Sequence, residues 1–390
     1  MSNTVVVLGA GAGGLTAVER LHAQLSSSDR IVLIDRSFVG SLGLSALRVL
    51  AGWRTPAQVA ARVHALPGVE LVTGEVTRID TATKTVRYQR DDAVESIDYQ
   101  ALLIALGAGV DSSALPGLDD ALARGVAGEF YTPTGADALR RRLHALDSGR
   151  VVVLVAGLPF KCPPAPYEAA FLIADQRWEK VTSGAIRVDV ITAEPRPIPV
   201  VGPEVGKALV AMLDARGIGF QAGRAAQAIS GNSIEFTDGS SERFDLVAVV
   251  PPHTSPVAQL LPEGVNDGGW IPVDRTLNTG LPAVWAVGDN TVLTLANGKP
   301  LPKAGVFAEG AARVAADQIA RHLGYAVPDT EFTGEGGCYL EIGGGLAAKV
   351  AGHFLAEPAP RVAMYEPNAT FHAEKEQLER DWLSRWGDTL

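Results

Sequence analysis

The residues Val5-Val-Val-Leu8-Gly9-Ala-Gly11-Ala-Gly-Gly14 decide the fold of this 390-residue chain. The unbroken apolar run of residues 5–8 is typical of a buried strand in a parallel sheet, and helical periodicity follows over residues 15–25. Glycines spaced G-x-G-x-x-G between such a strand and such a helix indicate a dinucleotide-binding loop. Gly9 permits the tight turn, Gly11 lets the backbone approach a pyrophosphate, and Gly14 lets the helix pack closely on the strand. The free N–H groups at the start of the helix favour the phosphates.

An acidic residue follows the second strand of the same unit. Residues 31–34 form an aliphatic strand that ends in Asp35, which is placed to accept hydrogen bonds from an adenosine ribose. Residues 101–108 form another buried strand that ends in small residues, and Ala105 and Gly107 are candidate contacts of the cofactor. The strands, the helix and the acid together predict a bound dinucleotide.

A later segment distinguishes FAD from NAD. Residues 279–289, Thr-Gly-Leu-Pro-Ala-Val-Trp-Ala-Val-Gly-Asp, resemble the late FAD motif of flavoproteins with two dinucleotide domains. In that motif a hydrophobic strand ends in Gly-Asp, here Gly288-Asp289, and the aspartate binds the ribityl chain of the flavin. The alternative is a strand followed by an ordinary turn, in which Gly and Asp are common. At this distance from an N-terminal glycine loop, the motif favours FAD.

A second strand–loop–helix unit lacks the glycines of the first. Residues 151–155 predict a buried strand, residues 165–178 predict a helix, and residues 186–191 predict the next strand. The connecting loop, Gly157-Leu-Pro-Phe-Lys-Cys-Pro-Pro-Ala-Pro166, is rich in proline instead of glycine. Proline has no N–H to offer a phosphate, and its ring blocks close approach. We therefore expect a nicotinamide cofactor to bind poorly or not at all at this loop.

The two cysteines of the chain, Cys162 and Cys338, stand at informative positions. Cys162 lies in the proline-rich loop at the entrance to a helix, beside Lys161, and both features favour the nucleophilic thiolate. Glu168 is a candidate proton acceptor for the thiol; the alternative is an exposed glutamate in the first turn of the helix. Two buried, inert thiols are the alternative for the cysteines themselves, since free cysteine is often buried.

Composition limits the function classes. With 47% hydrophobic and 20% charged residues the chain is an ordinary globular protein of two or three domains. A net charge of -10 argues against nucleic-acid binding. We expect no metal site. Because the N-terminus runs directly into the first strand, we expect no export signal and a cytoplasmic location. No apolar run approaches the roughly 18 residues of a membrane-spanning helix.

The motifs together resemble the sulfide:quinone oxidoreductase family, with the flavoprotein subunit of flavocytochrome c sulfide dehydrogenase as the nearest variant. The segment Cys162-Pro-Pro-Ala-Pro-Tyr-Glu168, the FAD motifs and the late Cys338 carry this resemblance. It implies that the two cysteines form a redox-active disulfide beside the flavin, with Cys338 nearer the ring. It also implies that Lys303 lies next to the flavin, where a cation stabilises the reduced anionic form; the alternative is a solvated loop lysine.

The resemblance further implies the reaction and its partners. Sulfide attacks the disulfide, and electrons pass through FAD to quinone or a soluble acceptor. A third cysteine found in many members is missing, and residues 37–43 lack the cysteine that links flavin covalently in some relatives, so we expect non-covalent FAD. A small thiol or persulfide is an alternative substrate. An NADH:quinone or ferredoxin-type flavin reductase is an alternative enzyme, and a flavin-binding redox sensor is the non-enzymatic alternative.

The fold expected from these motifs is α/β, with two Rossmann-like domains and a small α+β cap. We assign residues 1–112 and 245–323 to a discontinuous FAD-binding domain, residues 113–244 to a second Rossmann-like domain and residues 324–390 to the cap. The cap should contain three antiparallel strands within residues 337–365 and a helix over residues 373–386.

The last helix is expected to present an apolar stripe of Leu378, Trp382 and Trp386 at helical spacing. Such a stripe is typical of a core or dimer contact, so a homodimer is possible. The alternative is an interfacial helix at the inner face of the membrane, beside the quinone pool. Residues 361–390 carry four basic and six acidic side chains, the wrong sign for anionic lipid, so membrane contact would be peripheral at most.

Overall fold

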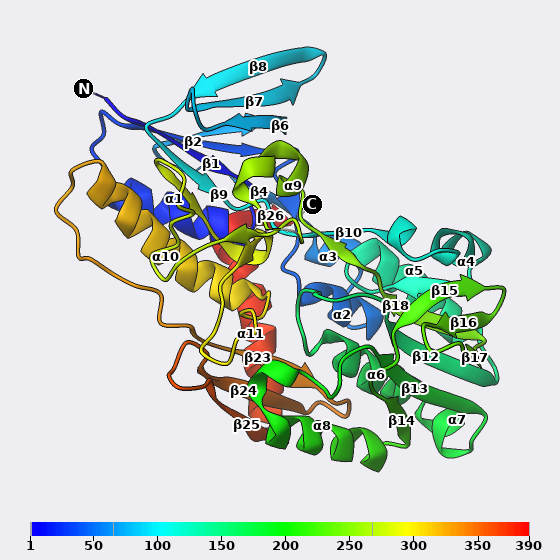
Figure 1. Cartoon of the computed structure of the whole chain (residues 1–390). Helices are drawn as coiled ribbons and strands as arrows, with labels where there is room; N and C mark the ends of the chain where they lie inside the picture. Colours follow the sequence, from blue (N-terminus) through cyan, green and yellow to red (C-terminus); the bar gives the residue numbers. More distant parts are fainter. Residues whose placement is uncertain (1, 65, 267, 390) are drawn as a thin grey trace.

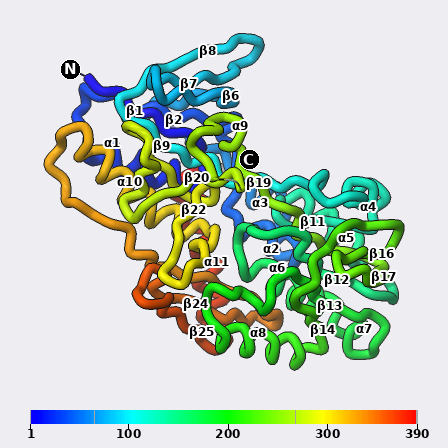
Figure 2. Tube along the Cα trace, viewed as in Figure 1, coloured from blue at the N-terminus to red at the C-terminus, as the bar shows by residue number. Residues whose placement is uncertain are grey.

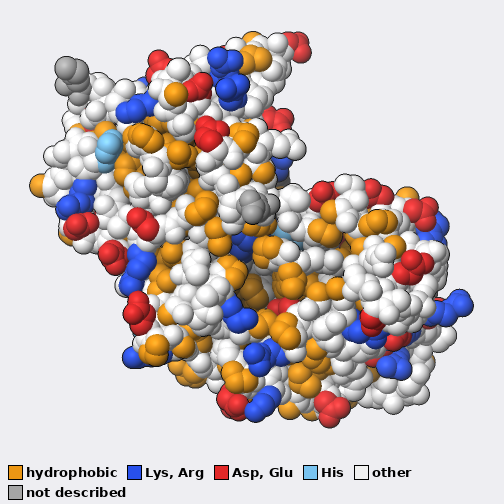
Figure 3. Space-filling model, in the orientation of Figure 1, with side chains coloured by type: hydrophobic (Ala, Val, Ile, Leu, Met, Phe, Trp, Pro, Cys, Tyr) orange, Lys and Arg blue, Asp and Glu red, His pale blue; other side chains and the backbone are white. Residues whose placement is uncertain are grey.

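The computed structural model describes residues 2–64, 66–266 and 268–389. Two five-stranded parallel sheets form the centres of two lobes, and a three-stranded antiparallel sheet with a long helix forms a third region (Figure 1). The α/β class and the two Rossmann-like units predicted from the sequence are confirmed. On the face drawn in Figure 3, hydrophobic side chains gather where the lobes meet.

The first sheet has the strand order β21-β9-β1-β2-β5. Side chains alternate between the two faces of a strand, so Val5 and Val7 share a core with helices α1 and α10, whereas Val6 and Leu8 pack towards the antiparallel sheet β6-β7-β8. Figure 2 shows α10 lying along α1, although the two helices come from opposite ends of the domain sequence. The elements are β1 (Thr4–Leu8), α1 (Ala12–Gln24), β2 (Arg30–Asp35), β5 (Val69–Thr73), β6 (Glu75–Asp80), β7 (Thr85–Arg90), β8 (Ala93–Asp98), β9 (Ala101–Ile104), β21 (Val284–Ala286) and α10 (Gly305–His322).

The second sheet has the order β11-β18-β12-β13-β14 and repeats the design of the first. Val151 and Val153 of β12 pack with helix α6, while Val152 and Leu154 pack with the small antiparallel sheet β15-β16-β17. The elements are β11 (Ala127–Glu129), α5 (Pro133–Ala145), β12 (Gly149–Val155), α6 (Ala165–Gln176), α7 (Trp178–Thr182), β13 (Ile186–Thr192), α8 (Pro203–Ala215), β14 (Ile218–Gln221), β15 (Ala226–Ser230), β16 (Ser233–Phe236), β17 (Ser241–Arg243) and β18 (Leu246–Val250).

The chain crosses between the two lobes twice. Residues on the two crossings pair with each other, because β10 (Gly109–Val110) is antiparallel to β19 (His253–Thr254). Strand β18 belongs to the second sheet, so the chain returns to the first domain after Val250, later than the boundary at residue 245 that the sequence suggested. A buried apolar strand alone does not reveal which of two parallel sheets it joins.

The C-terminal region contains β23 (Glu335–Glu341), β24 (Ala347–His353), β25 (Arg361–Asn368) and α11 (Ala369–Trp386). The three strands form the antiparallel sheet that the sequence predicted. After α11 the chain returns to the first domain, where β26 (Gly387–Thr389) pairs with β4 (Ala61–Val63), which in turn pairs with β3 (Val39–Gly40).

The predicted apolar stripe of α11 is partly wrong. Trp382 and Trp386 are buried, but Leu378 is 45% exposed. The buried face instead continues through Glu379 and Lys375, two charged side chains that sequence reasoning would place in solvent. Both have buried partners of opposite charge, which compensate for the cost of removing them from water.

Candidate functional site

The glycine loop of the first domain leaves room where a pyrophosphate would lie. A Cβ on Gly9 would come within 2.5 Å of the Ala105 carbonyl oxygen, and a Cβ on Gly14 within 1.8 Å of the Gly9 carbonyl oxygen. A Cβ on Gly11 would meet nothing within 4 Å. Gly9 and Gly14 are therefore required for packing, whereas Gly11 keeps an open approach to the N-terminus of α1.

Asp35 lies at the carboxyl end of β2, beside the glycine loop. Its Oδ2 accepts a hydrogen bond from the Ala10 N–H at 2.9 Å, and its Oδ1 accepts one from the Ser37 N–H at 3.0 Å. These contacts fix the carboxylate next to the loop. The position is the one from which an acid can accept hydrogen bonds from a ribose.

Gly107 and Asn290 meet where the neighbouring strands β9 and β21 end, in the same sheet. The Gly107 N–H donates to Asn290 Oδ1 at 3.0 Å, which joins the end of β9 to the short helix η4 (Gly288–Asn290). Asp289 Oδ1 is buried and has no hydrogen-bond partner among the described residues. Burial raises the pKa of this carboxyl group. An unsatisfied buried oxygen of this kind calls for a donor from a ligand, and a ribityl hydroxyl fits that need.

Lys303 is buried, so the alternative of a solvated loop lysine is wrong. Its Nζ donates to the Asp289 carbonyl oxygen at 2.7 Å and to the Thr291 carbonyl oxygen at 2.9 Å, and it lies 3.6 Å from the ring centroid of Trp270. Burial lowers the pKa of the Lys303 ammonium to about 8. A cavity bordered by Gly288, Asp289 and Lys303 opens at this point, at the N-terminal end of α10.

The cysteine loop of the second domain is hydrogen-bonded to the Lys303 segment of the first. The Cys162 N–H donates to the Lys303 carbonyl oxygen at 2.7 Å, and the Cys162 carbonyl oxygen accepts from the Ala165 N–H at 2.8 Å. Cys162 has a φ of 55°, a left-handed conformation that is uncommon outside glycine. Its contacts on both sides hold the backbone in this conformation and fix the residue beside the candidate flavin site.

The predicted activation of Cys162 by Lys161 does not match the structure. Lys161 Nζ donates to the Ala108 carbonyl oxygen at 3.2 Å, away from the thiol. The pKa of the Cys162 thiol is raised well above its ordinary value, first by burial and then by the nearby Cys338 and Glu168. Desolvation of the thiolate therefore opposes ionisation of Cys162.

Cys338 lies in the middle of β23, opposite Val350 of β24. Burial raises the pKa of its thiol to about 11, and the charge of Lys375 opposes that rise. The two thiols are free in the structure. They lie close enough together that the negative charge of an ionised Cys338 raises the pKa of Cys162. The fold thus brings both cysteines to one site, beside the Lys303 segment.

Glu168 is buried rather than exposed. Its carboxylate forms an ion pair with Lys375 of α11, and the two side chains are only 2% and 3% exposed. Burial raises the pKa of Glu168, while Lys375 lowers it. Sequence reasoning missed Lys375 because a lysine on a helix far along the chain carries no signal that it will be buried beside a cysteine.

A second acid was also missed. Glu194 follows β13 as Asp35 follows β2, but its carboxylate is 4% exposed and accepts hydrogen bonds from Tyr167 Oη at 2.6 Å and Thr192 Oγ1 at 3.3 Å. Burial raises its pKa to about 7. The carboxylate of Glu194 is thus closed off by the protein itself. Its place after the strand was visible in the sequence, whereas its enclosure was not.

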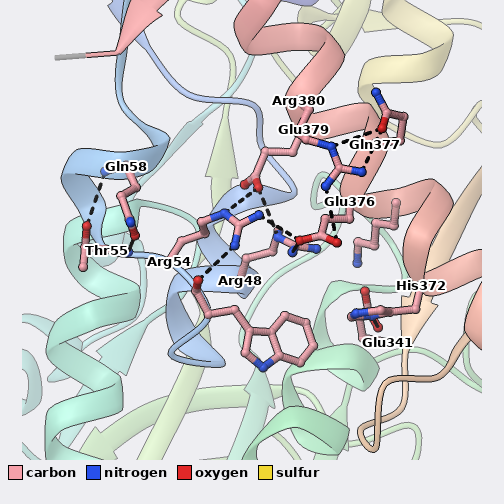
Figure 4. A network of polar contacts seen from close by, with 12 residues as sticks. Arg48, Arg54, Thr55, Gln58, Glu341, His372, Glu376, Gln377, Glu379 and Arg380 are labelled. Carbon is pink, nitrogen blue, oxygen red and sulfur yellow. Dashed lines mark hydrogen bonds and ion pairs between the residues drawn. The ribbon is translucent and has the colours of Figure 1, made fainter.

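Charged side chains tie α11 to the first domain (Figure 4). Arg48 and Arg54, from helix α2 (Ser45–Leu50) and the turn after it, form ion pairs with Glu376 and Glu379 at 2.9–3.2 Å. In α11 itself, His372 Nδ1 lies 2.9 Å from the buried carboxylate of Glu341, a residue of β23. Helix α11 is therefore fixed at both its first-domain contact and its contact with β23.

The described residues contain no group of His, Cys, Asp and Glu side chains suited to a metal ion. None of the described helices is long and apolar enough to span a bilayer.

Comparison with known proteins indicates a family. A family model described as pyridine nucleotide-disulphide oxidoreductase matches residues 3–312. Human apoptosis-inducing factor 3 is 28% identical over 76% of the chain and 46% of that protein, and a type II NADH:quinone oxidoreductase of Mycobacterium tuberculosis is 26% identical over 73% and 65%. The chain thus spans about half to two thirds of these relatives. The structure of the sulfide:quinone oxidoreductase from Aquifex aeolicus superposes with a TM-score of 0.83, covering 98% of this chain and 91% of that one at 21% identity, which shows a shared fold.

Proposed function

The chain belongs to the pyridine nucleotide-disulphide oxidoreductase family, whose members are FAD-binding flavoproteins, and we propose that it oxidises sulfide through Cys162 and Cys338. One observation carries the proposal: both thiols and the buried Glu168–Lys375 pair converge beside the Lys303 segment of the flavin site. A small thiol or persulfide is the alternative sulfur substrate. Non-covalent FAD would be held by Gly11, Asp35 and Asp289.

The cysteine pair would work as a disulfide that a hydrosulfide ion opens. Attack of HS⁻ on the Cys162 sulfur breaks the S–S bond, leaves a persulfide on Cys162 and releases Cys338 as a thiolate. A second HS⁻ takes the outer sulfur as hydrodisulfide and leaves Cys162 as a thiol. Cys162 and Cys338 would then re-form the disulfide with release of one proton from the Cys162 thiol, and FAD, when bound, would supply the two-electron oxidant. Glu168, beside the pair, is the group that can accept this proton.

The second loop supports sulfide over NADH as the electron donor. Pro163 and Pro164 offer no N–H group to a phosphate, and Glu194 is already bonded to Tyr167. A ribose hydroxyl would have to displace that buried hydrogen bond, which is unfavourable. Quinone, reached by peripheral membrane contact, is the proposed electron acceptor, and a soluble acceptor is the alternative. The proposal also includes a homodimer.

An NADH:quinone reductase is the second candidate, because a curated relative with that name covers most of this chain. A flavin-binding sensor without turnover is the non-enzymatic alternative. Anaerobic stopped-flow mixing of the FAD-loaded protein with sulfide and, separately, with NADH distinguishes the candidates. We expect sulfide to bleach the oxidised flavin at least about 100-fold faster than NADH, followed by reoxidation when a quinone is added.

Cys162→Ser is the matched variant for this experiment. It removes one sulfur of the proposed disulfide, and we expect at least a 100-fold slower bleaching by sulfide with normal flavin content, as for other residues that act as a covalent unit. Rapid bleaching of the wild-type flavin by NADH, or unchanged bleaching of the variant by sulfide, would refute the proposed reaction. Flavin that reoxidises with no quinone-dependent turnover would favour the sensor.

A further inference from the structure

We infer that Lys375 is a positioning residue whose ion pair with Glu168 directs ionisation within the cysteine pair, so that Cys338 becomes the thiolate and Cys162 keeps its proton. The inference deepens the proposed function and rests on it for its meaning in turnover. The ionisation itself can be measured without any substrate. The two ideas can therefore fail separately.

The geometry of the ion pair gives it a direction. Lys375 Nζ donates to Glu168 Oε1, and the same Nζ lies 3.5 Å from the carbonyl oxygen of Tyr339, the residue next to Cys338 on β23. Glu168 lies in the first turn of α6. This helix begins just after Cys162, and its first residue, Ala165, donates its N–H to the Cys162 carbonyl oxygen. The ammonium of Lys375 thus lies against the backbone of β23 beside Cys338, and its partner Glu168 comes from the helix that follows Cys162.

The energetic cost of the pair indicates a role other than stability. Both side chains are at most 3% exposed, and an ion pair buried to this extent gains little over two apolar side chains of similar volume. Replacing Lys375 by methionine and Glu168 by glutamine at the same time would leave no buried charge. A charge pair beside two thiols can influence which of them ionises, whereas methionine and glutamine carry no charge to do so.

The influence on each thiol agrees with the geometry. Burial raises the pKa of both cysteines and is the largest cause at each. At Cys338 the lowering effect of Lys375 exceeds the raising effect of Glu168, and the resulting pKa is about 11. At Cys162 the negative charge of Cys338 is the largest cause of a raised pKa after burial, and Glu168 then outweighs Lys375. The net effect of the ion pair therefore favours ionisation at Cys338 and opposes it at Cys162.

Other charged and titratable groups face the site from neighbouring elements. Asp289 of the first domain raises the pKa of Cys162, and the buried Tyr131 hydroxyl interacts with the same thiol. Glu341 of β23, bonded to His372, raises the pKa of Glu168. Of these groups, Asp289 works directly against ionisation of Cys162. Lys375 is the one cation that influences both thiols among the described residues.

The presence of only two cysteines makes the test direct. Cys162→Ser leaves Cys338 as the single thiol, and Cys338→Ser leaves Cys162. The rate of alkylation by iodoacetamide as a function of pH then reports the ionisation of one thiol in the reduced, FAD-loaded protein. With Cys338 alone, we expect Lys375→Met to slow alkylation about tenfold at pH 8, the effect of one pKa unit, and Glu168→Gln to accelerate it.

Two further lysine variants separate electrostatics from structure. Lys375→Arg keeps the charge and should restore most of the alkylation rate of Cys338. Lys349→Met is the matched control. Lys349 lies in β24, next to the strand that contains Cys338, and its partner is Glu374 rather than Glu168. Equal effects of Lys375→Met and Lys349→Met, or an unchanged rate of Cys338 alkylation in Lys375→Met, would overturn the inference.

A double variant protects the test against misfolding. Lys375→Met alone leaves Glu168 buried without a partner and can destabilise the protein. Glu168→Gln combined with Lys375→Met leaves no buried charge. We expect this double variant to slow alkylation of Cys338, where the lysine dominates, and to accelerate alkylation of Cys162, where the glutamate dominates. Changes of the same sign at both cysteines would contradict a directed ion pair.

Discussion

The strand–loop–helix units of the two lobes share a backbone plan but differ at the loop. In each unit a buried parallel strand, β1 or β12, leads into a helix, and an acid follows the neighbouring strand. In the first unit the loop consists of residues 9–11 and keeps an open space at Gly11. In the second it spans residues 156–164 and contains Cys162. One fold thus supports two chemistries, because the loop, and not the sheet, determines what can bind.

The acids of the two units sharpen the contrast. Asp35 is held by backbone N–H groups beside the open loop, where it can still bind a ligand. Glu194 is enclosed and bonded to Tyr167 and Thr192. A ligand at the first acid gains hydrogen bonds, whereas a ligand at the second would have to break existing ones. The carboxylate of the second unit is therefore already bonded within the protein, whereas that of the first lies beside an open loop.

The largest effect is expected from Gly14→Ala. A methyl group there would lie 1.8 Å from the Gly9 carbonyl oxygen, so α1 must move away from β1. We expect a loss of about 3 kcal/mol or more in the free energy of unfolding, and protein that retains little flavin. Thermal unfolding and the flavin-to-protein absorbance ratio measure both.

Gly157→Ala is the matched change in the second loop. Its methyl group would meet Pro252 at 3.0 Å, a contact that a small shift relieves, and it should leave the flavin content unchanged. If Gly14→Ala retained normal flavin and stability, or if Gly157→Ala lost flavin to the same degree, the assigned difference between the two loops would be wrong.

The acids give the next largest effect. Asp35→Ala removes a charged acceptor for the ribose, and we expect FAD affinity to fall about 10- to 100-fold. Glu194→Gln should leave FAD affinity as it is, because its carboxylate faces Tyr167 in the other lobe. Titration of the apoprotein with FAD, followed by flavin fluorescence, measures both. Equal losses in the two variants would show that the acids act through stability rather than through ligand contact.

Local pattern and the late FAD motif were enough to predict the nucleotide unit, both Rossmann-like sheets and the antiparallel cap. Each depends on contacts that are local or that repeat a known supersecondary plan. The sequence could not predict that Lys161 would point to Ala108 or that Lys375 would lie against Glu168. Those contacts join segments far apart in the chain, and burial of a lysine leaves no periodic signal. The boundary error at residue 245 has the same origin.

The last prediction concerns the pH dependence of stability. The pKa of Glu194 is about 7 in the folded protein, compared with 4.5 for an unperturbed glutamate, so the folded state binds this proton more tightly than the unfolded chain does. Its contribution to the free energy of unfolding is complete below pH 4.5 and is lost as the pH rises through 7, by at most about 3 kcal/mol. Glu194→Gln removes this loss, so the variant should gain stability relative to wild type between pH 4.5 and 7.

Tyr167→Phe tests the same assignment in the opposite direction. The Tyr167 hydroxyl lowers the pKa of Glu194 by donating to its carboxylate, so its removal should extend the loss of stability to higher pH. His253 affects the pH dependence of stability in the opposite direction. Burial lowers its pKa to about 4, below the 6.5 of an unperturbed histidine, so stability is lost as the pH falls below 6.5. Denaturant unfolding at a series of pH values should therefore give diverging curves for Glu194→Gln and Tyr167→Phe. Parallel curves would mean that Glu194 does not hold its proton up to neutral pH, and that the second acid is still available to a ligand.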